Sequence, residues 1–432
     1  MSRRRALPLL LCLLVPLAGA ADRPAAADAA AAAEPALLAA RRLARDGLAA
    51  HEAGDNQTFL ERMTAAVALR PDYPRLLVDL AEAQVLNEQT AVAVATLGRL
   101  ADLGASSPVE QDAVFAPLLD RKDFKAVRTR LDANLDPVGA LRIAFMLPDM
   151  TGLINGIAWR PKTGEYFFGD VYARGVWVRT SDGKVRRWDH PDDRLWAVLA
   201  LAVDEEHGTL WAATSAVPGM RGYTADQDGR AGVAEFDLAT GELRRVAPVP
   251  LDGRAHTLAN LALAPDGTLF LPDSVAPVLW RLAPGAREPE RVMESGEFIS
   301  LQGVAVAPDG SLWIADHANG LLHVDPAARQ VDRVEAPPHT TLVGLGGLAL
   351  APNGDLIAVQ NGLHPLRVLR LVLDASGSAV AAVKVLESAH LTMAEPALGC
   401  VAGDSFVFIG NAGWSRFEGP EPAPTPPRPV PV

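Results

Sequence analysis

The stretch Leu261-Ala-Leu-Ala-Pro-Asp-Gly-Thr-Leu-Phe-Leu271 decides the fold, because it returns twice almost unchanged. The second copy is Val304-Ala-Val-Ala-Pro-Asp-Gly-Ser-Leu-Trp-Ile314, and the third is Leu348-Ala-Leu-Ala-Pro-Asn-Gly-Asp-Leu-Ile-Ala358. Each copy predicts two strands joined by a tight turn, in which glycine takes a positive φ that other residues avoid. A unit of about 40 to 45 residues with this pattern is typical of a propeller blade.

Looser copies of the repeat extend the pattern in both directions. Two begin at Ile157 and Leu201, and a degraded one covers residues 398–410. Downstream of each copy two further strands are expected, which gives the four strands of a blade. The sequence therefore predicts a mainly β protein with a six-bladed propeller over residues 140–418. We expect residues 140–147 to pair with the sixth blade and close the ring, because closure removes an exposed sheet edge.

Both ends of the chain differ from the repeats. Basic Arg3 to Arg5, an apolar run from Leu7 to Leu17 and a small-residue end at Ala18-Gly-Ala20 predict a signal peptide over residues 1–20. The run is too short to span a membrane, so we expect an exported bacterial protein, periplasmic or secreted. Residues 21–34 form an alanine-rich linker. The proline-rich residues 419–432 predict a disordered or polyproline II tail, because proline lacks the donor that a sheet needs.

Residues 35–137 change to a helical period. Gly54-Asp55 separates two predicted helices, and Ala68-Leu-Arg-Pro-Asp-Tyr-Pro74 ends the second. Offsets of 34 residues resemble tetratricopeptide repeats. Such helices bind a protein or peptide partner, or they pack onto the propeller as a cap, and the sequence favours neither.

Charge and motifs exclude several functions. The chain has 52 acidic and 40 basic residues and no basic stripe, which argues against nucleic-acid binding. It has no Gly-x-Ser-x-Gly elbow of a serine hydrolase, and its glycines are turn glycines rather than a phosphate loop.

Polar residues stand where the inner strand of each blade begins, next to the expected channel. They are Asn155, Asn260 (or its neighbour Ala259), Gln302 and Glu395. Oxygen ligands of this kind suit a hard cation such as Ca²⁺, and equally suit water or a polar ligand. Trp196, His256 and Asn361 are further candidate ligand-binding residues near the channel mouth. Asp273 and Asp316, which follow second strands, are expected to accept backbone hydrogen bonds in turns.

Four of these phrases carry a resemblance to a known family. Asn155-Gly-Ile-Ala, Gln302-Gly-Val-Ala-Val-Ala-Pro-Asp-Gly, Ile314-Ala-Asp316 and Ile409-Gly-Asn-Ala-Gly-Trp414 resemble the senescence-marker-protein, gluconolactonase and luciferin-regenerating-enzyme family. NHL-type propellers are more distantly similar. The resemblance implies one divalent metal in the channel, held by Glu, Asn and Asp, and hydrolysis of sugar lactones. Aligned with the family, its metal-binding Glu falls on Asn155, and one Asn falls on Ala259 or Asn260. The Asp that serves as ligand and general base falls on Gln302.

These departures shape the expected function. An amide cannot take a proton at neutral pH, so Gln302 cannot be a general base. We therefore expect a catalytically degenerate protein that binds a small polar ligand through the channel mouth and a protein partner through its helices. The alternative is a divalent-metal-dependent lactonase or ester hydrolase with a rearranged ligand set of Asn155, Asn260, Gln302 and Glu395. In that alternative Glu395 is the catalytic acid or base and the metal activates water.

Overall fold

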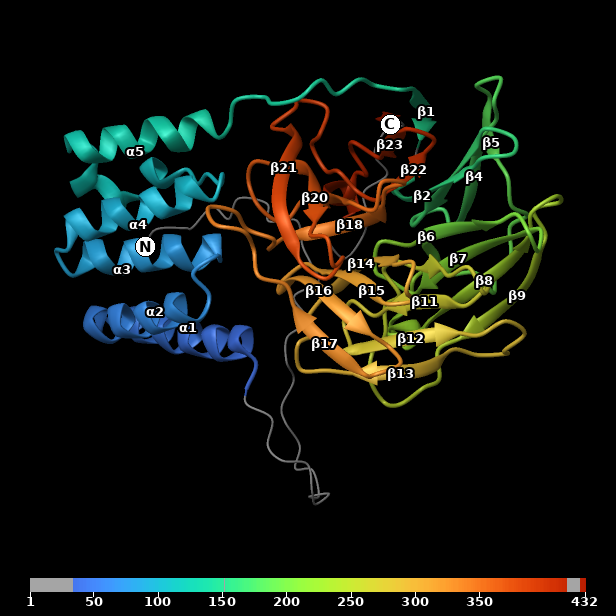
Figure 1. The fold of residues 1–432 in the computed structure, drawn as a ribbon, viewed down its shortest axis with the longest axis horizontal. Helices are drawn as coiled ribbons and strands as arrows, with labels where there is room; N and C mark the ends of the chain where they lie inside the picture. The colour runs from blue at the N-terminus through green and yellow to red at the C-terminus, as the bar shows by residue number, and fades with distance from the viewer. Residues whose placement is uncertain (1–33, 151, 418–427) are drawn as a thin grey trace, which may run out of the picture.

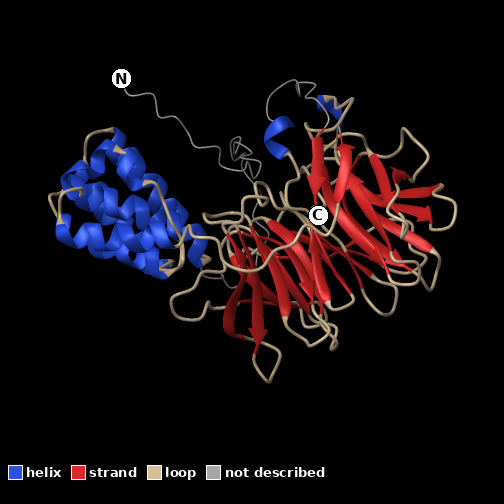
Figure 2. Ribbon diagram, turned by 90° about the horizontal axis from the view of Figure 1, so that it is seen from above, coloured by secondary structure: helices blue, strands red, loops and turns tan. Residues whose placement is uncertain are grey.

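The computed structural model describes residues 34–150, 152–417 and 428–432, which form a helical region and a β-propeller (Figures 1 and 2). The predicted signal peptide, nearly all of the linker and most of the tail lie outside the described residues. Export therefore stays a prediction. Among the described helices, none is both long enough and apolar enough to cross a membrane.

The helical region contains five α-helices, each packed on the next one in sequence. They are α1 (Ala36–Glu52), α2 (Asn56–Leu69), α3 (Pro74–Leu86), α4 (Thr90–Asp102) and α5 (Lys122–Ala133), with the short 3₁₀ turns η1 (Val109–Gln111) and η2 (Ala113–Leu118) before α5. The predicted break at Gly54-Asp55 is confirmed. Gly54 has a φ of +84°, and the Asp55 carboxylate caps α2 by accepting a hydrogen bond from the Thr58 backbone at 3.0 Å. Whether these helices belong to the tetratricopeptide class stays a prediction.

Five four-stranded antiparallel sheets form the blades of the propeller, numbered in chain order (Figure 1). Blade one contains β2 (Ile154–Arg160), β3 (Glu165–Asp170), β4 (Gly175–Arg179) and β5 (Val185–Arg187). Blade two contains β6 (Ala197–Asp204), β7 (Thr209–Ser215), β8 (Ala231–Asp237) and β9 (Leu243–Pro248), with the turn η3 (Ala225–Gln227) in an insertion. Blade three contains β10 (Ala262–Leu263), β11 (Leu269–Pro272), β12 (Val278–Leu282) and β13 (Glu290–Glu294). Blade four contains β14 (Leu301–Val306), β15 (Leu312–Asp316), β16 (Gly320–Asp325) and β17 (Gln330–Arg333). Blade five contains β18 (Leu345–Leu350), β19 (Leu356–Gln360), β20 (Arg367–Leu373) and β21 (Val380–Ser388).

The prediction of six blades is not confirmed, because the described residues form five four-stranded sheets. The degraded sixth repeat gives only the hairpin of β22 (Gly399–Ala402) and β23 (Ser405–Phe408). Strand β22 nevertheless contacts β18 on one side and β2 on the other, so it completes the ring of inner strands. Beyond β23 the chain continues into a 3₁₀ turn, η4 (Trp414–Phe417), instead of a third strand of the hairpin's sheet.

The end of the tail corrects a second prediction. Arg428–Pro431 forms strand β24 and pairs antiparallel with β1 (Met146–Met150), with Leu147 opposite Val430. Val430 and Val432 are buried, and the Val432 backbone N–H donates to Phe145. Prolines alternate with these valines, and the valines keep the backbone N–H donors that strand pairing needs. We expected residues 140–147 to pair with the sixth blade, but β1 pairs with β24 and not with the hairpin of β22 and β23. Gly410, just after β23, donates a hydrogen bond to the Pro431 carbonyl of β24 at 2.8 Å.

Buried carboxylates at the ends of second strands fix the loops at one end of the blades. Asp316 is fully buried and accepts hydrogen bonds from the backbone N–H groups of Ile299, Ser300, Ala318 and Asn319. Asp273 accepts from three backbone N–H groups and from the Trp280 indole. The prediction that both carboxylates bind backbone in turns is confirmed. We call this end of the propeller the mouth, because Asn155 and Gln302 lie at the same end of their strands.

The helical region docks on the mouth side of blades four and five. Arg70, which is 1% exposed, donates to the Asn319 side chain at 2.8 Å, and Arg333 pairs with Asp72 at 2.8 Å. The buried Arg367 donates to the carbonyls of Leu103 and Gly104, just beyond the C-terminus of α4. Figures 1 and 2 show the helices grouped together to one side of the propeller. The helices therefore pack on the propeller. That their other faces bind a protein partner stays a prediction.

Candidate functional site

A β-bulge recurs at the mouth end of the inner strands. The register shifts between Ile154 and Gly156 in β2, between Val198 and Ala200 in β6, between Leu301 and Gly303 in β14, and between Leu345 and Leu348 in β18. A bulge re-aims the extra residue and is frequent next to binding sites. Asn155 and Gln302 occupy this position in their strands.

Blade three resolves the choice between Ala259 and Asn260. Leu258 bridges to Asp273, as Ile154 does to Asp170 and Leu301 to Asp316. Ala259 is therefore the residue that corresponds to Asn155 and Gln302. Asn260 lies one position further, is 9% exposed, and its side-chain oxygen accepts a hydrogen bond from the Leu261 backbone at 2.8 Å.

Asn155 joins three parts of the mouth. Its amide nitrogen donates to the Leu199 carbonyl of β6 at 2.9 Å, and its amide oxygen accepts from the Trp414 indole at 3.1 Å. Both polar ends of the side chain are thus occupied. Asn155 holds blade one against blade two and against the segment of residues 395–417, which we call the closing segment.

The closing segment carries the next two candidates. One carboxylate oxygen of Glu395 accepts from the Ser415 backbone N–H at 3.1 Å, beside Trp414. Asn361, just after β19, donates to the Pro396 carbonyl at 2.9 Å. Continuous contacts therefore connect Asn155, Glu395 and Asn361 through the closing segment.

Two oxygens in this set lack a partner. The second carboxylate oxygen of Glu395 and the side-chain oxygen of Asn361 are both buried and accept no hydrogen bond from any described residue. They flank the same residue, Pro396. A buried polar atom without a partner costs about 1–3 kcal/mol, and such atoms are rare in native proteins unless water, an ion or a ligand completes them.

Trp414, which donates to Asn155, packs against an apolar cluster that includes other aromatic side chains. Trp196 and Trp414 are partly exposed and pack against the same apolar cluster, together with Tyr172. Tyr172 also lies 5.0 Å from the Phe417 ring, centroid to centroid. Partly exposed aromatic faces beside a few polar groups are the usual lining of a small-molecule site.

The other candidates are not connected to this set by hydrogen bonds among the described residues. The Gln302 amide donates to the Ser300 hydroxyl at 3.3 Å, within its own blade. Asn260 bonds only to its neighbour's backbone. His256 is 1% exposed and is held between two carboxylates, Asp273 at 2.7 Å and Asp252 at 3.0 Å, so both of its ring nitrogens are occupied. We therefore remove His256 from the ligand-binding set.

His256 gives a prediction about pH. Burial alone would lower the pKa of His256, but the facing carboxylates of Asp273 and Asp252 outweigh it and raise this pKa above its ordinary value. Protonated His256 therefore adds stability that is fully present below about pH 6.5 and is lost as the pH rises through the folded-state pKa. Arg254 and Arg291 also form ion pairs with Asp252.

We expect His256→Gln to lower the unfolding free energy more at pH 6 than at pH 9, with a difference on the order of 1 kcal/mol per unit of pKa shift. Urea unfolding at both pH values measures this. His339→Gln, which changes an exposed histidine, is the control. A His256→Gln effect that is equal at the two pH values would contradict the prediction.

The residues present fit a divalent cation poorly. Three of the four candidate ligands are amides, and the Asn155 oxygen already accepts from Trp414. Among the described residues no group of three or more His, Cys, Asp or Glu side chains is placed to hold a metal. A hard cation prefers several charged oxygens. We therefore assign no chemical step at this site to a metal.

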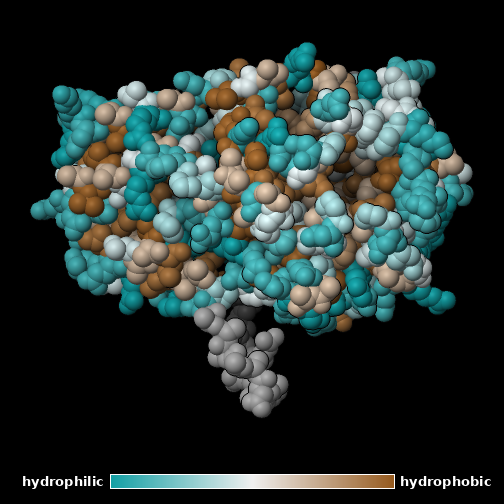
Figure 3. All heavy atoms as spheres, in the orientation of Figure 1, coloured by the Kyte–Doolittle hydropathy of each residue, from teal (hydrophilic) through white to brown (hydrophobic). Residues whose placement is uncertain are grey.

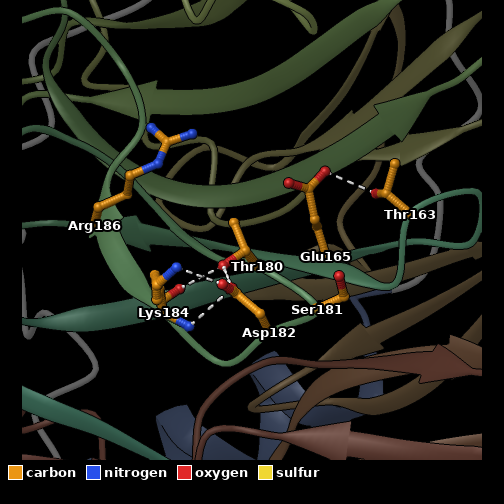
Figure 4. A pocket seen from close by; sticks show the side chains of 7 residues that line it. All are labelled: Thr163, Glu165, Thr180, Ser181, Asp182, Lys184 and Arg186. Carbon is orange, nitrogen blue, oxygen red and sulfur yellow. Dashed lines mark hydrogen bonds and ion pairs between the residues drawn. The ribbon is translucent and has the colours of Figure 1, made fainter.

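Two surface hollows lie away from these residues. One of about 500 Å³ lies at the opposite end of blade one, near the β2–β3 and β4–β5 turns (Figure 4). Its polar groups bind one another: Lys184 pairs with Asp182 at 2.7 Å, and this contact helps lower the pKa of Asp182 to about 2. A second hollow is lined by His190–Asp192 and Glu242–Arg244. We interpret both hollows as parts of surface turns.

Sequence reasoning missed Trp414, which donates to Asn155, and the tail residue Arg428, which donates to Asn411. Trp414 stands in the phrase Ile409-Gly-Asn-Ala-Gly-Trp414. Its position just after a degraded repeat was the sequence signal that could have identified it. Arg428 lies in the proline-rich tail, for which no strand was expected.

The fold defines the class of this protein as a β-propeller with an N-terminal helical region. Similar solved structures include virginiamycin B lyase from Staphylococcus aureus, with 14% identity, a TM-score of 0.43, and coverage of 61% of this chain and 80% of that one. A protein assigned as a gluconolactonase has 19% identity, a TM-score of 0.44, and coverage of 60% and 84%. An oxidoreductase assigned as a glucose dehydrogenase, from Thermus thermophilus, has 17% identity, a TM-score of 0.45, and coverage of 66% and 97%. At these scores none of them bears on the activity of this chain. No family model and no curated protein matches the sequence.

Proposed function

We propose that this protein is a gluconolactonase-like propeller that binds, without hydrolysing, a small molecule rich in hydroxyl groups at the mouth. The observation that carries the proposal is the buried, unpartnered carboxylate oxygen of Glu395, close to the partly exposed indole of Trp414. A carboxylate accepts hydrogen bonds and donates none, so the missing partner is a donor. Asn361, whose amide nitrogen donates to the Pro396 carbonyl, offers a second unpartnered acceptor.

The aromatic residues support a ligand with both polar and apolar faces. Trp196 and Trp414 offer ring faces on which the C–H groups of a sugar-like molecule can pack, while hydroxyl groups reach Glu395 and Asn361. A reaction is not part of the proposal. Gln302 stands where the resemblance expects a base, and an amide cannot accept the proton.

Calorimetric titration with a panel of neutral sugars and polyols tests this proposal. We expect saturable binding that Glu395→Gln weakens by about ten- to a hundredfold, because a hydrogen bond to a charged acceptor contributes about 1.5–3 kcal/mol. Glu290→Gln, which changes an exposed carboxylate on β13, is the matched control and should bind as the wild type does. Absence of binding to every member of the panel would overturn the proposal.

The same panel separates binding from catalysis. Sugar lactones are included and followed for ring opening, with and without added Ca²⁺. Hydrolysis that disappears in Glu395→Gln would contradict the non-catalytic part and favour the lactonase alternative.

Export, and a protein partner for the helices, are further parts of the proposal. Hydrophobic residues reach the surface over the helical half as well as over the propeller (Figure 3), and Val92 on α4 is 49% exposed.

A further inference from the structure

Two arginines meet at a glycine in the closing segment. Arg416 comes from η4 and Arg428 from β24, and both approach Gly413, whose φ is +90°. A Cβ atom at Gly413 would lie 2.6 Å from the terminal nitrogen Nη2 of Arg428 and 3.4 Å from Cδ of Arg416. Only a residue without a side chain leaves room for this approach.

Arg428 is incompletely bonded. Its Nη2 donates to the Asn411 side-chain oxygen at 3.0 Å, but its Nε is buried and meets no acceptor among the described residues. Nor does any described carboxylate form an ion pair with it. A buried Nε–H without an acceptor is costly, so this position calls for an acceptor, preferably an anionic one.

The charges around Gly413 favour the same kind of ligand. Burial and the nearby charge of Arg428 lower the pKa of Arg416, while Glu395 acts in the opposite direction. An oxyanion bound between the arginines would match the planar donors of guanidinium.

We propose that Arg416, Arg428 and Asn411 frame an oxyanion site at the mouth, which holds the carboxylate or phosphate group of the ligand. The position fits the site described above, because Asn411 forms a β-bridge with Glu395. This inference rests on the proposed function in one respect: it assigns an anionic group to the same ligand whose hydroxyl groups reach Glu395. The site's own anion affinity can be measured independently.

The probes are inorganic phosphate and acetate, titrated at low ionic strength into the full chain. We expect saturable binding of at least one of them, weakened by about tenfold or more in Arg428→Gln through loss of a charge-assisted bond. Arg186→Gln removes an exposed positive charge from β5 and is the control for net charge. Arg416→Gln is the second variant, and the far-UV spectrum of each variant reports whether it folds.

Glu395→Gln separates this inference from the proposed function. It should weaken neutral sugars but leave phosphate binding intact or stronger, because it removes a competing negative charge. Anion binding without any sugar binding would end the proposed function and keep the oxyanion site. Failure of both anions to bind, or an equal loss in Arg186→Gln and Arg428→Gln, would overturn the oxyanion site.

Discussion

Arg70→Met is expected to destabilise the protein by about 3–5 kcal/mol and to let the helical region unfold before the propeller. Arg70 is 1% exposed and donates to Asp72 at 3.1 Å and to the Asn319 side chain at 2.8 Å. Methionine keeps most of the apolar stem but none of the donors. Asp72 then keeps only the Arg333 ion pair, and the Asn319 oxygen loses its bond across the interface.

Two spectroscopic probes can follow the two parts separately. All eight tryptophans lie between residues 159 and 414, so tryptophan fluorescence reports on the propeller. Far-UV circular dichroism at 222 nm is dominated by the helices. In the wild type we expect the two urea transitions to coincide, and in Arg70→Met we expect the helical transition to move to lower urea.

The matched control is Arg128→Met on α5. Arg128 also pairs with an aspartate, Asp132 at 3.7 Å, but both side chains are exposed (49% and 61%), so its loss should cost about 1 kcal/mol or less. Coincident transitions in Arg70→Met with a cost as small as that of Arg128→Met would show that the interface does not depend on this buried arginine.

Arg367 explains why the docking does not depend on ion pairs alone. Burial lowers the pKa of Arg367 to about 10, and its bonds are to neutral acceptors: Gln360 and the carbonyls of Leu103 and Gly104. Those carbonyls follow the C-terminus of α4, where the helix dipole is negative. The helix end thus supplies part of the countercharge. The propeller therefore recognises the helical region through backbone as well as side chains.

The sequence repeats made the blades predictable, but the way in which the chain closes the propeller could not be predicted. Gly164, Gly267 and Gly310 all have positive φ, as the turn pattern required. The strand β24 escaped prediction because its residues read as a solvated polyproline segment. Its pairing depends on Val430 and Val432 entering a core built by distant residues, which no local pattern reveals.

The site was predictable in part for the same reason. Asn155 and Glu395 stand at positions that the repeat register marks as facing the mouth. Their partners, Trp414 and Ser415, follow from tertiary contacts of a degraded repeat. The choice between Ala259 and Asn260 depended on the position of a β-bulge, which is a property of strand pairing. His256 was misplaced because its carboxylate partners come from two different loops.

Asp316→Ala is expected to have an effect as large as that of Arg70→Met, about 3–5 kcal/mol of unfolding free energy. The buried carboxylate accepts from four backbone N–H groups, with distances of 2.6 Å to Ile299 and 2.8 Å to Asn319 among them. Burial raises the pKa of Asp316, which shows that the charge itself is held at a cost. Alanine removes that cost but leaves four donors without an acceptor in a loop that cannot admit water freely, and the second effect is the larger.

Asp309→Ala, in the same blade, is the control for Asp316→Ala. Asp309 is exposed and accepts only from the backbone and hydroxyl of Ser311, so its removal should cost about 0.5–1 kcal/mol. Urea unfolding followed by tryptophan fluorescence measures both variants. Because Asn319 bonds both to Asp316 and to Arg70, the Asp316→Ala and Arg70→Met effects should be less than additive in the double variant. Strict additivity would mean that the loop of blade four and the helical interface are energetically independent.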